Sequence, residues 1–168
     1  HAIRLGETKA AVDVPFIFKA YYWPQKAGFA STTGYHYRRE SESSVTVNFR
    51  KNSNCDFELQ AYKDVETWCR EAKVSGQYQN LIQFRKVSRY IDMLAAIKPD
   101  GFKALFDKIK PELQAIDGKV IVNIAQKLDQ AQVVDKFEAI TTGDAEGYRK
   151  AWGGDGVGVD LAVKLTAR

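Results

Sequence analysis

The pattern of apolar and polar residues changes twice along the chain, from strand-like alternation to helical spacing and back to alternation. Residues 45–51 alternate most clearly, with Val45, Val47 and Phe49 on one side and polar residues on the other. Residues 157–165 alternate in the same way near the end of the chain. Alternation of this kind is typical of a half-buried strand, so we expect a strand at each place.

Three further segments are predicted to be strands. Residues 12–23 are rich in aromatic and β-branched types, with Pro15 expected at the start or edge of the strand. Residues 29–40 are polar and aromatic and predict a second, irregular strand. Residues 57–62 follow a turn signal at 52–54 and are expected to pair with 45–51 as a hairpin.

The middle of the chain has the spacing of helices. Residues 81–97 carry apolar side chains three and four positions apart, which predicts a helix that ends before Pro99. The apolar run 120–125 fits either a buried strand or the start of a helix that continues to Ile140, and periodicity does not decide. Short helices are also expected at 65–73 behind an Asp64 N-cap, at 102–109, from Pro111, and from Asp144 to near Trp152.

The order of these elements predicts the fold class. Strands come first, helices follow, and one strand closes the chain. This order favours a single α+β domain over residues 1–168, in which the C-terminal strand joins the N-terminal strands in an antiparallel sheet packed with several short helices.

Positive charge is concentrated in the first third of the chain. Residues 1–51 hold 8 Lys and Arg against 4 Asp and Glu, whereas residues 52–168 hold 17 against 17. The whole formal charge of +4 therefore belongs to the first segment, which also contains nine of the twenty aromatic residues. Aromatic rings beside cations form the usual surface for single-stranded nucleic acid.

We therefore expect non-enzymatic binding of single-stranded nucleic acid, RNA or DNA, through the N-terminal sheet. On a strand, Lys19, Tyr21 and Trp23 would share one face, with Phe16, Phe18 and Tyr22 on the other. The expected stacking residues are Tyr21, Trp23, Tyr35 and Tyr37, and the expected phosphate partners are Lys19, Arg38, Arg39 and Arg50.

Two other interpretations of the aromatic segment stay open. Its rings can be ordinary sheet core with arginines at the rim, because strands recruit aromatic residues for packing alone. Its strands can also form the interface of a homo-oligomer, which would make the protein a structural or assembly subunit. No apolar run approaches the ~20 residues of a membrane span.

A copper site is a third hypothesis, based on the two histidines, His1 and His36. A chain-terminal histidine binds Cu(II) through its amine and imidazole, and a second imidazole completes the site. This pair resembles the histidine brace of copper-dependent polysaccharide monooxygenases, and the resemblance covers these two residues only. It would imply a secreted protein with a native His1. If His1 is instead left from processing or a tag, His36 is a surface residue and the cytoplasm is favoured.

Other candidate chemistry is weaker. Cys55 and Cys69 match no zinc pattern, and we expect free, packed thiols rather than a disulfide. Pro99-Asp100 followed by Asp117-Gly118-Lys119 resembles the PD…DxK string of a nuclease superfamily. In that family the DxK residues lie on a strand, whereas both acids here stand at predicted turns, so a chance match is expected.

Overall fold

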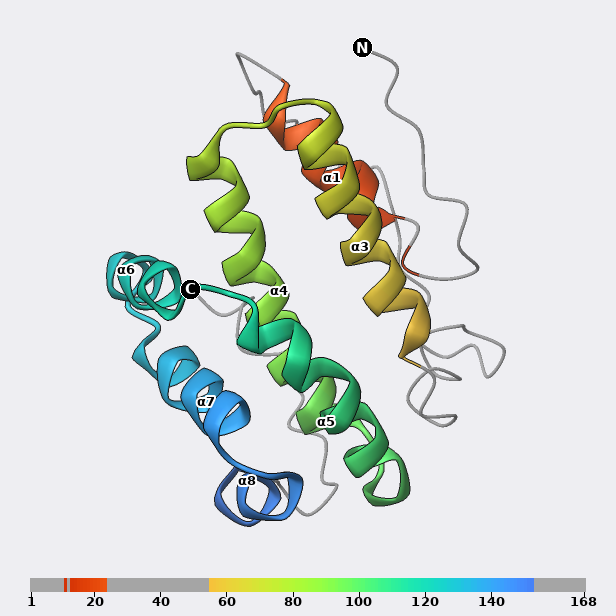
Figure 1. Ribbon diagram of the computed structural model, residues 1–168, viewed down its shortest axis with the longest axis vertical. Helices are drawn as coiled ribbons and strands as arrows, with labels where there is room; N and C mark the ends of the chain where they lie inside the picture. Colours follow the sequence, from red (N-terminus) through yellow and green to blue (C-terminus); the bar gives the residue numbers. More distant parts are fainter. Residues whose placement is uncertain (1–10, 12, 24–54, 153–168) are drawn as a thin grey trace, which may run out of the picture. The chain divides into compact units, whose positions relative to one another are not determined.

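The computed structural model describes residues 11, 13–23 and 55–152 of the chain. Within this part the backbone forms seven helices and no strand (Figure 1). The predicted α+β fold with an antiparallel sheet is therefore wrong, because the described part of the chain is all helical. The helices are α1 (Asp13–Tyr22), α3 (Asp56–Glu71), α4 (Gly76–Ala96), α5 (Pro99–Gln114), α6 (Gly118–Leu128), α7 (Ala131–Thr142) and α8 (Ala145–Trp152).

The chain divides into two compact units, residues 1–86 and 87–168. The boundary falls inside helix α4. The described part of the first unit contains α1, α3 and α4 as far as Lys86. The second unit contains the rest of α4 and helices α5 to α8.

Helix α1 replaces the strand predicted at 12–23. Val14, Phe18 and Tyr22 stand four residues apart and therefore share one face of the helix, which packs on the core of the first unit. Pro15 is buried in the first turn, where the missing N–H costs no helical hydrogen bond. The segment is apolar almost throughout, so its aromatic composition favoured a strand while its four-residue spacing was overlooked.

Helix α3 overturns the predicted hairpin at 57–62 and the predicted N-cap at Asp64. Leu59, Tyr62, Val65 and Cys69 are all buried, and their spacing of three and four residues is that of one helix face. Asp64 lies inside the helix, where its carboxylate accepts a hydrogen bond of 2.8 Å from the Gln60 side chain. The expected short helix at 65–73 is therefore the second half of a longer one.

Helices α4 and α5 agree in part with the sequence predictions. The helix expected from Leu81 is confirmed, although it begins earlier, at Gly76, and it ends before Pro99 as predicted. The two short helices expected at 102–109 and from Pro111 are instead one helix, α5, with Pro111 inside it.

Capping residues separate the last three helices. The Asp117 carboxylate accepts a hydrogen bond of 2.9 Å from the Lys119 N–H at the start of α6. Residues 120–125 lie in α6, so the strand alternative is wrong, but the helix ends at Leu128 and does not continue to Ile140 as the other alternative expected. Asp129 has a left-handed backbone conformation, with φ 54°, and ends α6. The predicted Asp144 cap is confirmed, since its Oδ1 accepts a hydrogen bond of 2.7 Å from the Gly147 N–H in α8.

The second unit has an apolar core in which aromatic rings meet between α5 and α8. The ring centroids of Phe102 and Phe106 lie 6.2 Å and 5.8 Å from that of Tyr148. Burial, with a smaller contribution from the Asp92 charge, raises the pKa of Tyr148 to about 12. Other buried members of this core are Leu105, Ile109, Leu113, Ile121, Ala125, Val133, Phe137 and Ile140.

The predicted strands at 29–40, 45–51 and 157–165 lie outside the described residues. None of the described helices is long and apolar enough to cross a membrane.

Candidate functional site

The inner face of helix α1 is fixed by an aromatic cluster in the first unit. The Tyr22 ring centroid lies 5.7 Å from that of Trp68 in α3 and 5.0 Å from that of Tyr78 in α4. The Tyr78 hydroxyl donates a hydrogen bond of 2.7 Å to the Phe18 carbonyl oxygen. These contacts hold the side of α1 that carries Phe18 and Tyr22 against α3 and α4, and so fix the rotation of α1 about its own axis.

The outer face of α1 carries large apolar side chains that are exposed. Phe16 is 37% exposed, Ile17 is 41% exposed and Tyr21 is 77% exposed. Asp13 is also exposed and opens the helix. Because a helix turns by about 100° per residue, Asp13, Phe16, Ile17 and Tyr21 occupy one arc, roughly opposite the buried arc. We call these four residues the α1 outer face.

The predicted nucleic-acid residues in α1, and Trp23 directly after it, do not share a face. Alternate residues of a helix point in different directions, so the strand argument that grouped Lys19, Tyr21 and Trp23 fails. The Lys19 ammonium lies 6.0 Å from the centre of the Trp68 ring, and the Trp23 ring packs edge-on at 4.9 Å from the Tyr22 ring. Of the three, Tyr21 alone belongs to the α1 outer face.

The other predicted site residues lie outside the described residues. These are the stacking and phosphate candidates Tyr35, Tyr37, Arg38, Arg39 and Arg50, and the copper candidates His1 and His36. Their roles stay predictions. In the part of the chain that the structure describes, no group of three or more His, Cys, Asp or Glu side chains is arranged to hold a metal ion.

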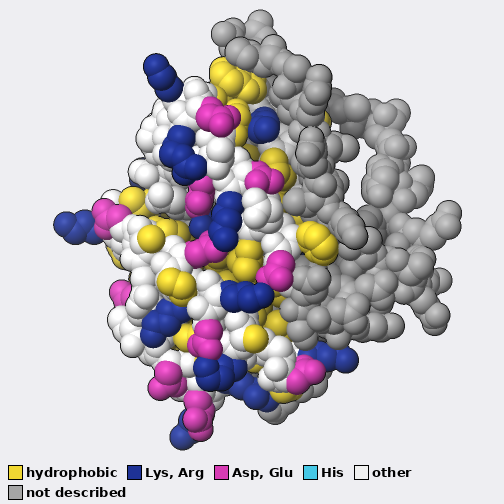
Figure 2. Space-filling view, turned by 45° about the vertical axis from the view of Figure 1, so that its right-hand side comes forward, with side chains coloured by type: hydrophobic (Ala, Val, Ile, Leu, Met, Phe, Trp, Pro, Cys, Tyr) yellow, Lys and Arg dark blue, Asp and Glu magenta, His cyan; other side chains and the backbone are white. Residues whose placement is uncertain are grey.

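Charges of both signs are mixed on the face of the described residues that Figure 2 shows. Figure 2 shows Lys and Arg side chains interleaved with Asp and Glu across the visible face. This mixture agrees with the balanced charge count of residues 52–168. The visible described surface therefore offers no basic track along which a phosphate backbone would run.

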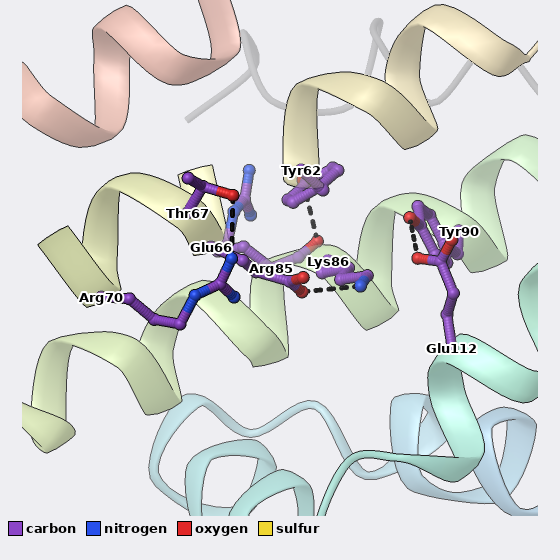
Figure 3. A network of polar contacts seen from close by, with 8 residues as sticks. All are labelled: Tyr62, Glu66, Thr67, Arg70, Arg85, Lys86, Tyr90 and Glu112. Carbon is purple, nitrogen blue, oxygen red and sulfur yellow. Dashed lines mark hydrogen bonds and ion pairs between the residues drawn. The ribbon is translucent and has the colours of Figure 1, made fainter. Parts of the chain in front are cut away.

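An ion pair lies between α3 and α4 in the first unit. The Lys86 ammonium is 2.7 Å from a Glu66 carboxylate oxygen (Figure 3). The Lys86 side chain is 4% exposed and that of Glu66 is 37% exposed. Nearby, the Tyr62 hydroxyl donates a hydrogen bond of 3.3 Å to the Arg85 carbonyl oxygen. In the second unit the Tyr90 hydroxyl bonds to the Glu112 carboxylate at 2.9 Å. All of these contacts join neighbouring helices, which is a structural role.

The two cysteines are free and buried, as predicted. Cys55 stands at the start of α3 and Cys69 fourteen residues later, so the helical rise places their Cα atoms about 21 Å apart. A disulfide needs less than about 7 Å, which excludes one between them. Burial raises the pKa of the Cys69 thiol to about 11, with a smaller contribution from the Glu66 charge and an opposing one from Arg70.

The two acids of the nuclease-like string have structural roles at the starts of helices. Asp100 lies in the first turn of α5, and Asp117 caps α6. Neither acid lies on a strand, as that family's pattern requires, so the chance match expected from the sequence is the better explanation.

We compared the chain with protein-family models, curated proteins and solved structures, and none of them matches it. A function therefore has to be argued from its own residues. The α1 outer face is the strongest candidate site. The sequence analysis placed Phe16 on the strand face opposite Tyr21 and gave Asp13 and Ile17 no role, although helical spacing would have placed all three on the same arc as Tyr21.

Proposed function

We propose that the protein is a non-enzymatic assembly subunit that associates with further copies of itself through the α1 outer face. The observation that carries this proposal is the exposure of Phe16, Ile17 and Tyr21 on one arc of a helix whose other arc is already packed. Exposed apolar clusters on a helix are typical of protein contacts.

The expected affinity is modest. Burying what remains exposed of each large side chain contributes about 1 kcal/mol, and two copies bring six such side chains together. The gross gain of roughly 6 kcal/mol corresponds to a dissociation constant of about 40 µM, and because the cost of association has still to be subtracted, this value is the tightest constant that these contacts allow. We therefore expect a monomer at low concentration and association at high concentration.

Sedimentation equilibrium from ~10 µM to ~1 mM tests this proposal, a range that starts below the tightest constant allowed by the contacts and extends well above it. The mean mass should rise with concentration. Ile17→Glu should keep the protein monomeric, because forming the contact would then bury an unpaired charge. Leu128→Glu in α6 is the matched control, because Leu128 is 49% exposed and the chemical change is the same. A constant monomer mass, or equal effects of both substitutions, contradicts the proposal.

Binding of single-stranded nucleic acid is a second candidate, favoured by the excess of Lys and Arg in residues 1–51. This candidate function no longer depends on the N-terminal sheet that the sequence predicted. Fluorescence anisotropy with a labelled oligonucleotide should show affinity that falls steeply between about 50 and 200 mM salt, as counterion release requires. Trp23→Ala combined with Arg38→Ala should weaken this binding. No binding at low salt, or binding unchanged in that variant, removes this candidate.

A further inference from the structure

We infer that two copies of the protein pair their α1 helices antiparallel, about a two-fold axis at Ile17, with Asp13 of each copy against Tyr21 of the other. This inference rests on the proposed function and specifies its geometry. It follows from the order in which polar and apolar groups occur along the α1 outer face.

The first argument is the position of the polar groups. Asp13, Ile17 and Tyr21 stand four residues apart, so they form one ridge along the outer face. Asp13 and Tyr21 are separated by about 12 Å along the helix, with Ile17 midway between them. A two-fold axis through the midpoint of such a ridge exchanges its ends and leaves Ile17 against Ile17.

The second argument is the chemistry of the two ends. An ionised carboxylate only accepts hydrogen bonds, whereas a tyrosine hydroxyl donates one. Antiparallel pairing brings each Asp13 to a Tyr21 and allows two charge-assisted hydrogen bonds. Parallel pairing would instead place Asp13 against Asp13, and two carboxylates repel each other. The ridge is therefore complementary to an inverted copy of itself, as an isologous contact requires.

The third argument is the absence of a cation from this ridge. The sequence of α1 contains one basic residue, Lys19, and its ammonium lies over the Trp68 ring on the side of α3. A second α1 helix therefore brings no cation to Asp13. Within two copies of this chain, the donor at the far end of the same ridge is Tyr21.

Disulfide trapping tests the geometry directly. Ile17→Cys should form a disulfide-linked dimer under mild oxidation, because this position meets itself on the axis. Asp13→Cys alone should not form a disulfide. The two copies of residue 13 would lie about 12 Å apart along the direction of the paired helices, which is beyond the reach of a disulfide. Asp13→Cys combined with Tyr21→Cys should cross-link. The wild-type protein is the background control, since Cys55 and Cys69 are both buried.

An exchange of charges tests the contact independently. Asp13→Lys should raise the dissociation constant of the dimer about tenfold, because it removes the acceptor. Adding Tyr21→Glu should restore association, because the ion pair then forms with the polarity reversed. Non-specific adhesion between apolar surfaces would show no such recovery.

The outcomes separate this inference from the proposed function. If the mass stays monomeric and no variant cross-links, both fail. If the protein dimerises and Ile17→Glu abolishes the dimer, the proposed function holds. In that case, cross-linking by Asp13→Cys alone, or no recovery in the charge-exchanged variant, overturns the antiparallel geometry.

Discussion

Lys86 shows at the scale of one residue how the first unit tolerates a buried charge. Its ammonium is almost completely removed from water and lies 2.7 Å from the half-exposed Glu66 carboxylate. Removing a charge from water costs several kcal/mol, and the opposite charge recovers part of that cost. The pair therefore joins α3 to α4 without being a source of large net stability.

We predict that Glu66→Gln lowers the free energy of unfolding by about 1–3 kcal/mol, because it leaves the buried Lys86 ammonium without the opposite charge of this pair. The matched control is Asp107→Asn, which breaks the exposed Lys103–Asp107 pair in α5. That change should cost less than about 0.5 kcal/mol. Urea denaturation of both variants measures the difference, and equal losses would contradict the argument.

Cys69 gives the first unit a dependence on alkaline pH. Burial raises the pKa of its thiol from the ordinary value of 9.0 to about 11 in the folded protein. Above pH 9 the unfolded state loses this proton and the folded state keeps it, so stability falls as the pH rises from 9.0 to about 11. We expect the loss from this group to approach about 2 kcal/mol at the upper end of that range.

The control for this pH effect is Cys69→Val, which fills similar space without an ionisable group. Urea denaturation at several pH values between about 8 and 11 should show a smaller loss of stability in the variant than in the wild type. The absolute stability of the variant is not the readout, because the new side chain also alters packing. Parallel pH profiles would show that Cys69 does not titrate as expected.

Side chains from a neighbouring helix close the C-terminus of helix α7. The Lys110 ammonium donates to the Gly143 carbonyl oxygen, and the Gln114 amide donates to the Thr141 carbonyl oxygen at 2.8 Å. Terminal carbonyls of a helix lack partners within it, so these two residues of α5 complete the cap. The position of α7 therefore depends on the polar side of α5 as well as on the apolar core.

We predict that Gly143→Ala destabilises the protein by about 1–3 kcal/mol, because a Cβ at this position would lie 2.6 Å from the Ala139 carbonyl oxygen. Gly76→Ala in α4 is the matched control, since a Cβ there meets nothing within 4 Å. The control should be neutral or stabilising by up to about 1 kcal/mol. Thermal unfolding of both variants decides, and a neutral Gly143→Ala would be the contrary result.

Sequence patterns predicted some elements better than others, for physical reasons. α4 and α8 carry clear signals, a long helical stripe in one and the Asp144 cap in the other. In α1 the aromatic and β-branched residues at 12–23 suggested a strand, and before α3 the turn signal at 52–54 suggested a hairpin strand at 57–62. Tertiary packing overrode that propensity, since Phe18 and Tyr62 pack against each other with ring centroids 6.1 Å apart. Pro111 likewise indicated a helix start but lies within α5.

At the scale of the whole molecule, the candidate site could be predicted only as a region. The aromatic content of the first third of the chain pointed to the segment that contains α1, and Tyr21, which was expected there as a stacking residue, is exposed. Which residues lie on the same face as Tyr21 depends on whether the segment is a strand or a helix. A period of two selected Lys19 and Trp23, whereas the helical period selects Asp13 and Ile17.

Both thiols belong to the first unit, one at the start of α3 and one within it, and this has a practical consequence for measuring how the molecule opens. A disulfide reagent such as DTNB reacts with a buried cysteine only when the surrounding structure opens. The rate of labelling thus reports local opening around α3, while amide exchange in α5 to α8 reports the second unit. Measuring the labelling rate and the amide exchange rate in increasing urea shows whether residues 1–86 and 87–168 unfold in one step or in succession.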